Sequence, residues 1–267
     1  MKKILYKAIV ILAISTFITA CSNDDDENTT TETGKLGLEF DNAFASNDLI
    51  LNTQANTTAN NEVLKISNVK YIVSNIVLTK ADGTTFTYPK SKSYFIVDEV
   101  AKDATTFHLT DVPTGDYIKV KFGIGVDKEQ WQLGASGQGD FLAQAQAEDL
   151  LWSWSAGYKF FAFEGTFTSA TVTAATSFMI HTGQTGTAYN YTEVTLDLPT
   201  KALVRGNISP DIHIVTDLSK ILDGQNTIKL SDNNMGGMGA MIMGGTILES
   251  ITTNISKMFR VDHVHND

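Results

Sequence analysis

Histidine is the residue type whose positions offer this chain the most chemistry. His263 and His265 are two residues apart, so they share one face if the chain there is extended. His181 ends an apolar, strand-like run, and His213 lies inside another such run. Neutral imidazole is a common ligand for zinc, copper and iron. These four histidines are the candidate metal ligands, although each could instead form a hydrogen bond within the fold or lie in solvent.

Two further groups of side chains allow more than one interpretation. The aromatic stretch 152–165 could be core, a carbohydrate-stacking surface or, through a tryptophan, part of a metal site. A methionine cluster could supply soft thioether ligands for Cu(I) or simply fill gaps in the packing. The cluster consists of Met235, Met238, Met241 and Met243.

No sequence signature of an enzyme accompanies these groups. The chain has no glycine-rich phosphate loop, no nucleophile elbow and no His-Glu-x-x-His helix. We therefore expect a non-enzymatic protein.

The N-terminus predicts export and a lipid anchor. Three lysines precede an apolar run over residues 8–18, and small residues follow directly before Cys21, the sole cysteine. This order of charge, apolar core and small residues is typical of a secretory signal, and the run is shorter than the ~20 residues that cross a bilayer. The position of Cys21 resembles a lipobox, at which bacteria attach lipid to the cysteine sulfur. We expect residues 1–20 to be a lipoprotein signal peptide and Cys21 to be the lipidation site.

Residues 21–34 predict a flexible acidic tether. They contain no apolar side chain after Cys21, so they cannot bury enough surface to offset the entropy lost on ordering. Acidic residues in this place resemble the surface-export signal of Bacteroidota lipoproteins. We expect a cell-envelope protein, lipid-anchored at the outer membrane on its surface or periplasmic face.

Charge excludes one class of partner. The net charge is -10, and removal of the three signal-peptide lysines leaves -13. Phosphate binding requires a basic patch, so nucleic acid is excluded as a partner.

The remaining residues, 35–267, predict one mainly β domain, a β-sandwich with a short central helix and a C-terminal helix. Period-two alternation or β-branched and aromatic runs indicate strands, separated by turn signals such as Asp82-Gly83. The strand candidates are 35–40, 69–78, 94–98, 116–122, 158–167, 178–181, 192–198 and 212–215. Good helix formers predict the central helix over 143–151, and helical spacing predicts the second over 246–260, with Thr246 and Glu249 as a capping box.

Four blocks in the same order resemble one known family. They are Tyr71-Ile-Val-Ser-Asn-Ile-Val-Leu78, Gly115-Asp-Tyr117 through Phe122-Gly-Ile-Gly-Val-Asp127, Trp152-Ser-Trp-Ser-Ala-Gly-Tyr-Lys-Phe-Phe-Ala-Phe-Glu-Gly165 and Phe178-Met-Ile-His-Thr-Gly183. The family is that of the methanobactin-operon copper-binding proteins, called MbnP-like, and the resemblance covers nearly the whole mature chain.

The resemblance implies a β-rich exported protein that binds copper. In related proteins the ligands include histidines and a kynurenine made from tryptophan, which a diheme peroxidase-type partner oxidises in some members. Carried onto this chain, His181 is the best-matched ligand, and Trp152 or Trp154 is the candidate for oxidation.

The leading hypothesis is thus a lipid-anchored, non-enzymatic protein that captures or hands on copper. It expects the four histidines to meet beside an indole. The alternative is a surface β-sandwich lipoprotein that binds a glycan or a protein partner without metal.

Overall fold

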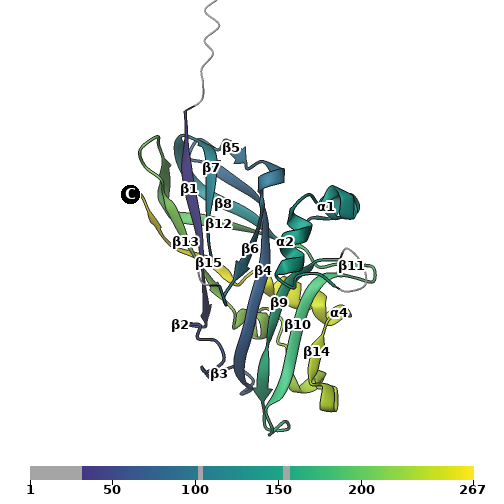
Figure 1. Cartoon of the computed structure of the whole chain (residues 1–267). Coiled ribbons are helices and arrows are strands. Elements are labelled where there is room, and N and C mark those ends of the chain that lie inside the picture. The colour runs from purple at the N-terminus through teal and green to yellow at the C-terminus, as the bar shows by residue number, and fades with distance from the viewer. Residues whose placement is uncertain (1–31, 102–104, 153–156) are drawn as a thin grey trace, which may run out of the picture. The chain divides into compact units, whose positions relative to one another are not determined.

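The computed structural model describes residues 32–101, 105–152 and 157–267 (Figure 1). The predicted signal peptide, Cys21, nearly all of the predicted tether, and Trp154 lie outside the described residues. Among the helices within those ranges, none is both long and apolar enough to cross a bilayer.

Two curled sheets form the domain, and the smaller one carries three of the candidate histidines. Its spatial order is β15-β13-β1-β2, and β7 also pairs with β1, along residues Thr33–Glu39 (Figure 1). The strand β1 lies parallel to β13, whereas β13 and β15 are antiparallel. The strands are β1 (Thr33–Phe44), β2 (Asn47–Asp48), β7 (Thr106–Pro113), β13 (Asp211–Asp217) and β15 (Phe259–His265).

The larger sheet has the order β11-β10-β9-β4-β8-β12 and carries His181 on β10. Four short strands extend it, with β14 on β10 and three others on the long strand β4. Its strands are β3 (Asn56–Thr57), β4 (Val63–Lys80), β5 (Thr85–Thr87), β6 (Tyr94–Asp98), β8 (Gly115–Ile124), β9 (Lys159–Thr168), β10 (Thr176–Thr185), β11 (Ala188–Tyr189), β12 (Thr192–Val204) and β14 (Ala240–Ile242).

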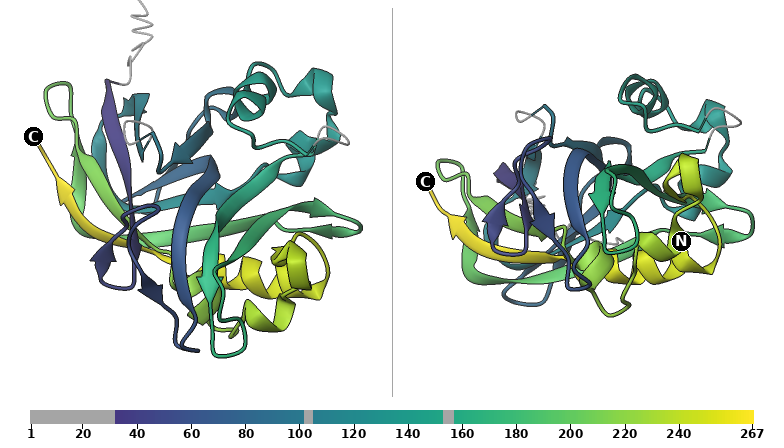
Figure 2. Two further views of the ribbon diagram at one scale, coloured as in Figure 1. Left: turned by 60° about the horizontal axis from the view of Figure 1, so that its bottom comes forward. Right: turned by 90° about the horizontal axis from the view of Figure 1, so that it is seen from below.

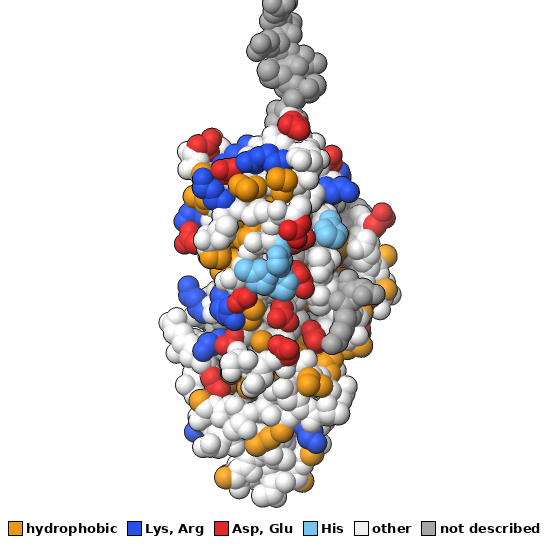
Figure 3. Space-filling model, turned by 90° about the vertical axis from the view of Figure 1, so that its left-hand side faces the viewer, with side chains coloured by type: hydrophobic (Ala, Val, Ile, Leu, Met, Phe, Trp, Pro, Cys, Tyr) orange, Lys and Arg blue, Asp and Glu red, His pale blue; other side chains and the backbone are white. Residues whose placement is uncertain are grey.

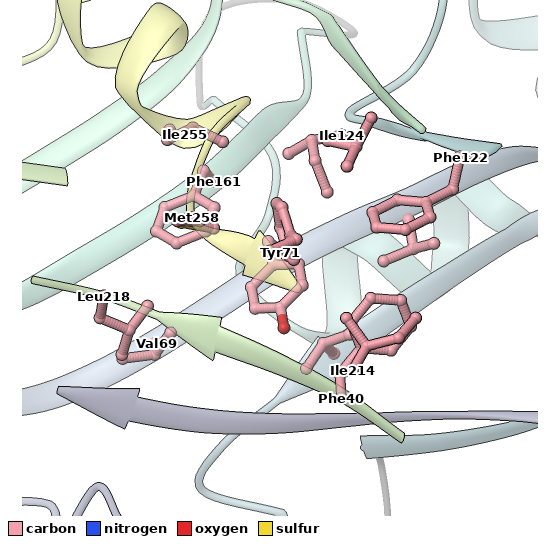
Figure 4. Packing of buried hydrophobic residues seen from close by; sticks show 14 of the residues in the cluster. Phe40, Val69, Tyr71, Phe122, Ile124, Phe161, Ile214, Leu218, Ile255 and Met258 are labelled. Atoms are coloured by element: carbon pink, nitrogen blue, oxygen red, sulfur yellow. The ribbon is translucent and has the colours of Figure 1, made fainter. Parts of the chain in front are cut away.

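A single large apolar core lies between the inner faces of the two sheets. Figure 4 shows Phe40 and Ile214 from the smaller sheet packed with Phe122 and Phe161 from the larger one. Because side chains alternate along a strand, the residues between these core positions point to the outer faces. The core therefore separates the two outer faces of the domain.

Tyr71 ties the sheets together at the centre of this core. Its ring is fully buried and stacks on Phe161 with 5.1 Å between ring centroids. Its hydroxyl lies 3.1 Å from Asn42 Oδ1 on β1 and 3.1 Å from Thr216 Oγ1 on β13. A buried hydroxyl without partners would cost about 1–3 kcal/mol, so these contacts favour one alignment of the sheets.

Helices cover part of the outer face of the larger sheet. A second apolar cluster there joins Ile72 and Phe160 of the sheet to Phe141 and Ala145 of α2. Figure 2 shows the teal α1–α2 segment apart from the yellow helix α4. The helices are α1 (Lys128–Gln132), α2 (Phe141–Ala147), α3 (Lys220–Asp223) and α4 (Thr246–Ile255).

The mainly β sandwich and every predicted strand are confirmed, but both predicted helices ended too late. The central helix α2 ends at Ala147, and Leu151 instead bridges to Tyr158. The helix α4 ends at Ile255, and the residues predicted as its last turn begin β15, where Phe259 packs into the core. The predicted capping box is wrong, because Gly245 occupies the N-cap position and no side chain caps it.

Candidate functional site

His181 lies on the outer face of the larger sheet and is only 4% exposed. Its neighbours Phe178 and Ile180 face the core, so alternation along β10 turns the imidazole the other way. Its Nε2 lies 2.6 Å from Glu164 Oε1 on the paired strand β9. Among the described residues, its buried Nδ1 has no hydrogen-bond partner.

The carboxylate of Glu164 selects the tautomer of this histidine. The hydrogen bond from His181 is the main cause that lowers the pKa of Glu164, ahead of burial, which acts in the opposite direction. The ionised carboxylate only accepts hydrogen bonds, so Nε2 of a neutral His181 carries the proton and donates it. The lone pair is then on Nδ1, the nitrogen that no described residue hydrogen-bonds.

Trp152 covers His181, with 5.5 Å between the ring centroids. The indole is 7% exposed, and the Lys159 ammonium lies 5.8 Å from its ring centroid. Gly183 makes this approach possible, because a Cβ there would lie 2.4 Å from the carbonyl oxygen of Tyr158 and 3.2 Å from Trp152 Nε1. Trp152 is thus packed between neighbours and offers no open ring face on which a sugar could stack.

The other three candidate histidines meet on the outer face of the smaller sheet. His213 and His263 are directly opposite on β13 and β15, and their rings stack with centroids 4.5 Å apart. His265 meets His263 edge-on, also at 4.5 Å, with only 2.8 Å between the two Nε2 atoms. We call the outward surface formed by Glu39, His213, Asp262, His263 and His265 the histidine face.

Carboxylates pair with two of these three imidazoles. Glu39 Oε2 on β1 lies 2.5 Å from His213 Nε2, and Asp262 Oδ2 lies 2.9 Å from His263 Nδ1. Asp262 reaches its own neighbour because β15 bulges there: His263 pairs with His213, Val261 pairs with Ile214, and Asp262 has no partner between them. The bulge turns Asp262 and His263 outward together, which a regular strand would not do. Figure 3 shows histidine side chains gathered on this face with acidic side chains around them.

The four predicted ligands therefore do not meet in one pocket. His181 lies on one outer face and the other three on the opposite one, with the core between them. Trp152 accompanies His181 alone. Over the described ranges, no three His, Cys, Asp or Glu side chains are arranged to hold one ion as they stand. Which of these histidines bind metal stays a prediction.

His108 lies beside the histidine face, although it was not among the four candidate ligands. It is exposed on β7 and pairs with Gly37 of β1. Gly37 also pairs with Asp211 of β13. Asp211 in turn pairs with His265. The antiparallel pairing of β7 with β1 brings His108 to this face. No local sequence pattern predicts that pairing.

The methionine cluster divides into two parts. Met235 and Met238 are 57% and 63% exposed, whereas Met241 is half-buried on β14 beside Met179 of β10. The described contacts bring none of these side chains to the histidine face.

Some residues of the family-like sequence blocks have a structural role. Asp127 accepts hydrogen bonds from Asn75, Tyr94 and Lys90 and caps α1 through the Gln130 amide. Burial would raise the pKa of Asp127, but these hydrogen bonds hold it well below its usual range. The Ser-Asn and Val-Asp parts of the sequence blocks thus anchor the α1 segment to the sheet.

Comparison with known proteins identifies the family. The model of the MbnP family matches residues 33–243, which is most of the chain. The chain is a member of the MbnP family. Among solved structures, MbnP from Methylosinus trichosporium is similar, with a TM-score of 0.46 and 12% identity over 81% of this chain and 82% of that one. A search of curated proteins gave no match.

The MbnP match covers the surroundings of the buried histidine and only part of the histidine face. Residues 33–243 contain Trp152, Glu164, His181 and Gly183, and so the whole surroundings of the buried histidine. His263 and His265 lie beyond the match, as does the helix α4. Membership of the MbnP family therefore bears on the His181 region, whereas the histidine face lies partly inside the match, with Glu39 and His213, and partly beyond it.

Proposed function

We propose that this member of the MbnP family is an exported, lipid-anchored protein that binds copper at His181 and captures or hands on the metal without catalysing a reaction. The observation that carries the proposal is the state of the His181 ring. One nitrogen is held by a carboxylate at 2.6 Å, and the other is buried without a partner in the described structure. A buried polar atom left in this way costs free energy unless a ligand satisfies it.

The pairing with Glu164 supports a ligand role for His181. Metal-binding histidines commonly donate their second ring N–H to a carboxylate, which fixes the ring orientation and raises the basicity of the ligating nitrogen. Here Glu164 Oε1 occupies that orienting position. It leaves the Nδ1 lone pair for the metal.

The surroundings favour copper over the harder ions. The site offers an imidazole beside an indole, and imidazole suits copper whereas magnesium and calcium require oxygen ligands. The resemblance of the Trp152 block adds a second donor to the proposal, since oxidation of the indole to kynurenine would introduce new nitrogen and oxygen ligands there. A diheme peroxidase-type partner would carry out that oxidation.

Cu(I) titration of the purified protein in competition with a chromogenic chelator tests the copper site. We expect His181→Ala to lose Cu(I) affinity by at least about a hundredfold, because even the loss of an orienting partner costs 10–100-fold. Glu164→Gln should lose about tenfold on the same basis. His108→Ala is the matched control, because it removes an exposed imidazole from another strand. Equal affinity of wild type and His181→Ala would refute the proposal.

The lipid anchor and the tryptophan modification are tested by intact mass. Protein isolated from its own cells should show cleavage before Cys21 and the added mass of acyl chains, and Cys21→Ser should abolish both. An oxidised Trp152 would appear as a further mass increase located by peptide sequencing. Protein that keeps residues 1–20 and carries no lipid would contradict the anchor.

A further inference from the structure

The histidine face lies outside the proposed copper site and shares no residue with it. We propose that His213, His263 and His265 form a second, solvent-accessible metal site for a divalent ion such as Cu²⁺ or Zn²⁺.

The Nε2 atoms of His263 and His265 face each other as candidate ligand atoms, joined by a hydrogen bond that a bound ion would replace. Their Nε2 atoms are 2.8 Å apart. Metal–imidazole bonds of ~2.0–2.1 Å at a tetrahedral angle separate two nitrogens by roughly 3.3 Å, so a small opening of this pair would admit an ion. Both rings sit on one strand two residues apart, and the backbone of β15 therefore fixes their spacing.

The orientation of His263 is the one that metal ligands require. Its Nδ1 lies 2.9 Å from Asp262 Oδ2, and an ionised carboxylate accepts a hydrogen bond from that nitrogen. The proton is thereby held on Nδ1, and Nε2 keeps the lone pair. The bulge at Asp262 is what places this carboxylate beside the ring.

His213 is the third ligand, and it moves into place when the ion binds. Its ring stacks on His263 at 4.5 Å and meets His265 at 6.1 Å, so all three imidazoles lie together. Its Nε2 is paired with Glu39, which explains why three donors do not converge in the present arrangement. The side chains of His213 and His263 are 23% and 43% exposed, which leaves the rings room to turn.

The chemistry of the donors selects the ion. Three imidazoles with a water or a carboxylate as the fourth ligand suit zinc and copper, and Cu²⁺ binds such sites more tightly than other divalent first-row ions. The nearby carboxylates add favourable charge for a cation. They are Glu39, Asp41, Asp48 and Asp262. Burial is the main cause that raises the pKa of Asp41, and repulsion from the other three carboxylates adds to it.

Titration with Zn²⁺ alone and with Cu²⁺ alone tests the site on the purified protein. We expect one equivalent of Zn²⁺ to bind wild type and His181→Ala with equal affinity. The double variant His263→Ala, His265→Ala should weaken Zn²⁺ binding by at least about a hundredfold, and Asp262→Asn by about tenfold. His108→Ala controls for a weakly bound ion elsewhere on the same sheet and should change the affinity less than about threefold.

Resonances of the imidazole nitrogens give an independent readout. Zn²⁺ should shift the Nε2 signals of His263 and His265 and leave those of His181 in place. Failure of wild type to bind Zn²⁺ or Cu²⁺, or unchanged binding by the double variant, would overturn the proposal. Neither result would touch the Cu(I) site, which depends on His181.

Discussion

The two outer faces of the sandwich use the same side chain in opposite ways. On the larger sheet, one imidazole is 4% exposed, paired with Glu164 and covered by an indole. On the smaller sheet, three imidazoles contact one another and lie open to solvent. The hydrogen bond to Glu164 commits His181 to one tautomer. Exposure leaves the other three rings room to turn.

The largest expected difference between the two outer faces concerns two glycines. A Cβ at Gly183 would lie 2.4 Å from the backbone oxygen of Tyr158, whereas one at Gly37 would meet the side chains of Asp211 and, at 3.4 Å, His108. We expect Gly183→Ala to lower the free energy of unfolding by about 2 kcal/mol, because the backbone must shift. Gly37→Ala should cost less than about 0.5 kcal/mol, since the carboxylate of Asp211 can turn away.

Urea unfolding of both glycine variants measures this difference. Gly37→Ala also serves as the control for adding a methyl group to a strand. Equal losses would mean that the Trp152 side of the larger sheet is as adaptable as the histidine face.

The two histidine–carboxylate pairs give a smaller contrast. Glu164→Gln turns a charged hydrogen bond of a buried histidine into a neutral one, and we expect a loss of about 1 kcal/mol at pH 7. Glu39→Gln changes a pair whose members are 23% and 36% exposed, so the loss should be below about 0.5 kcal/mol.

The pH dependence of Glu164→Gln sharpens this contrast. The pKa of Glu164 is lowered below its ordinary 4.5 in the folded protein, chiefly by the hydrogen bond from His181. The stabilisation is therefore complete above pH 4.5 and is lost as the pH falls through the lowered pKa. Unfolding measured between pH 7 and pH 3 should show wild type and variant converge at the acid end. A constant difference would contradict the assignment of Glu164 as the charged partner.

The smallest effect is expected at the edge of the histidine face. Arg260 Nη1 lies 2.7 Å from Asp262 Oδ1, with both side chains about half exposed. Arg260→Ala should change the free energy of unfolding by less than about 0.5 kcal/mol, as is usual for a surface ion pair. Thermal unfolding in low and high salt would measure this change. A loss above about 1 kcal/mol would contradict the assignment of the histidine face as an adjustable surface.

Local patterns predicted the strands well because each one has a buried inner side. Alternation over 192–198 and the β-branched run at 94–98 both correspond to strands of the structure. The strand β7 was missed, and its burial pattern shows why: only Leu109 and Val112 are fully buried along it. The end of α4 was misplaced because Met258 and Phe259 continue a helical spacing although they pack against the core from outside the helix.

The sequence could not predict which histidines lie together where that depends on the pairing of distant strands. The sequence identified His263 and His265 as neighbours on one face, and β15 bears this out. It could not tell that β13 would bring His213 to them and that β10 would carry His181 to the other sheet. Nothing local marks Glu164 or Glu39 as partners, because each is joined to its histidine across strands far apart in the chain.

The bulge of β15 has a consequence for how such a surface arises. Val261 and Val264 face inward on either side of it, so the codon for Asp262 could be removed and leave an ordinary strand with both imidazoles still outward. Deletion of this one residue would remove the carboxylate that orients His263 and leave the packing of the core side chains unchanged. A single inserted triplet is thus enough to place a carboxylate beside the His263 ring.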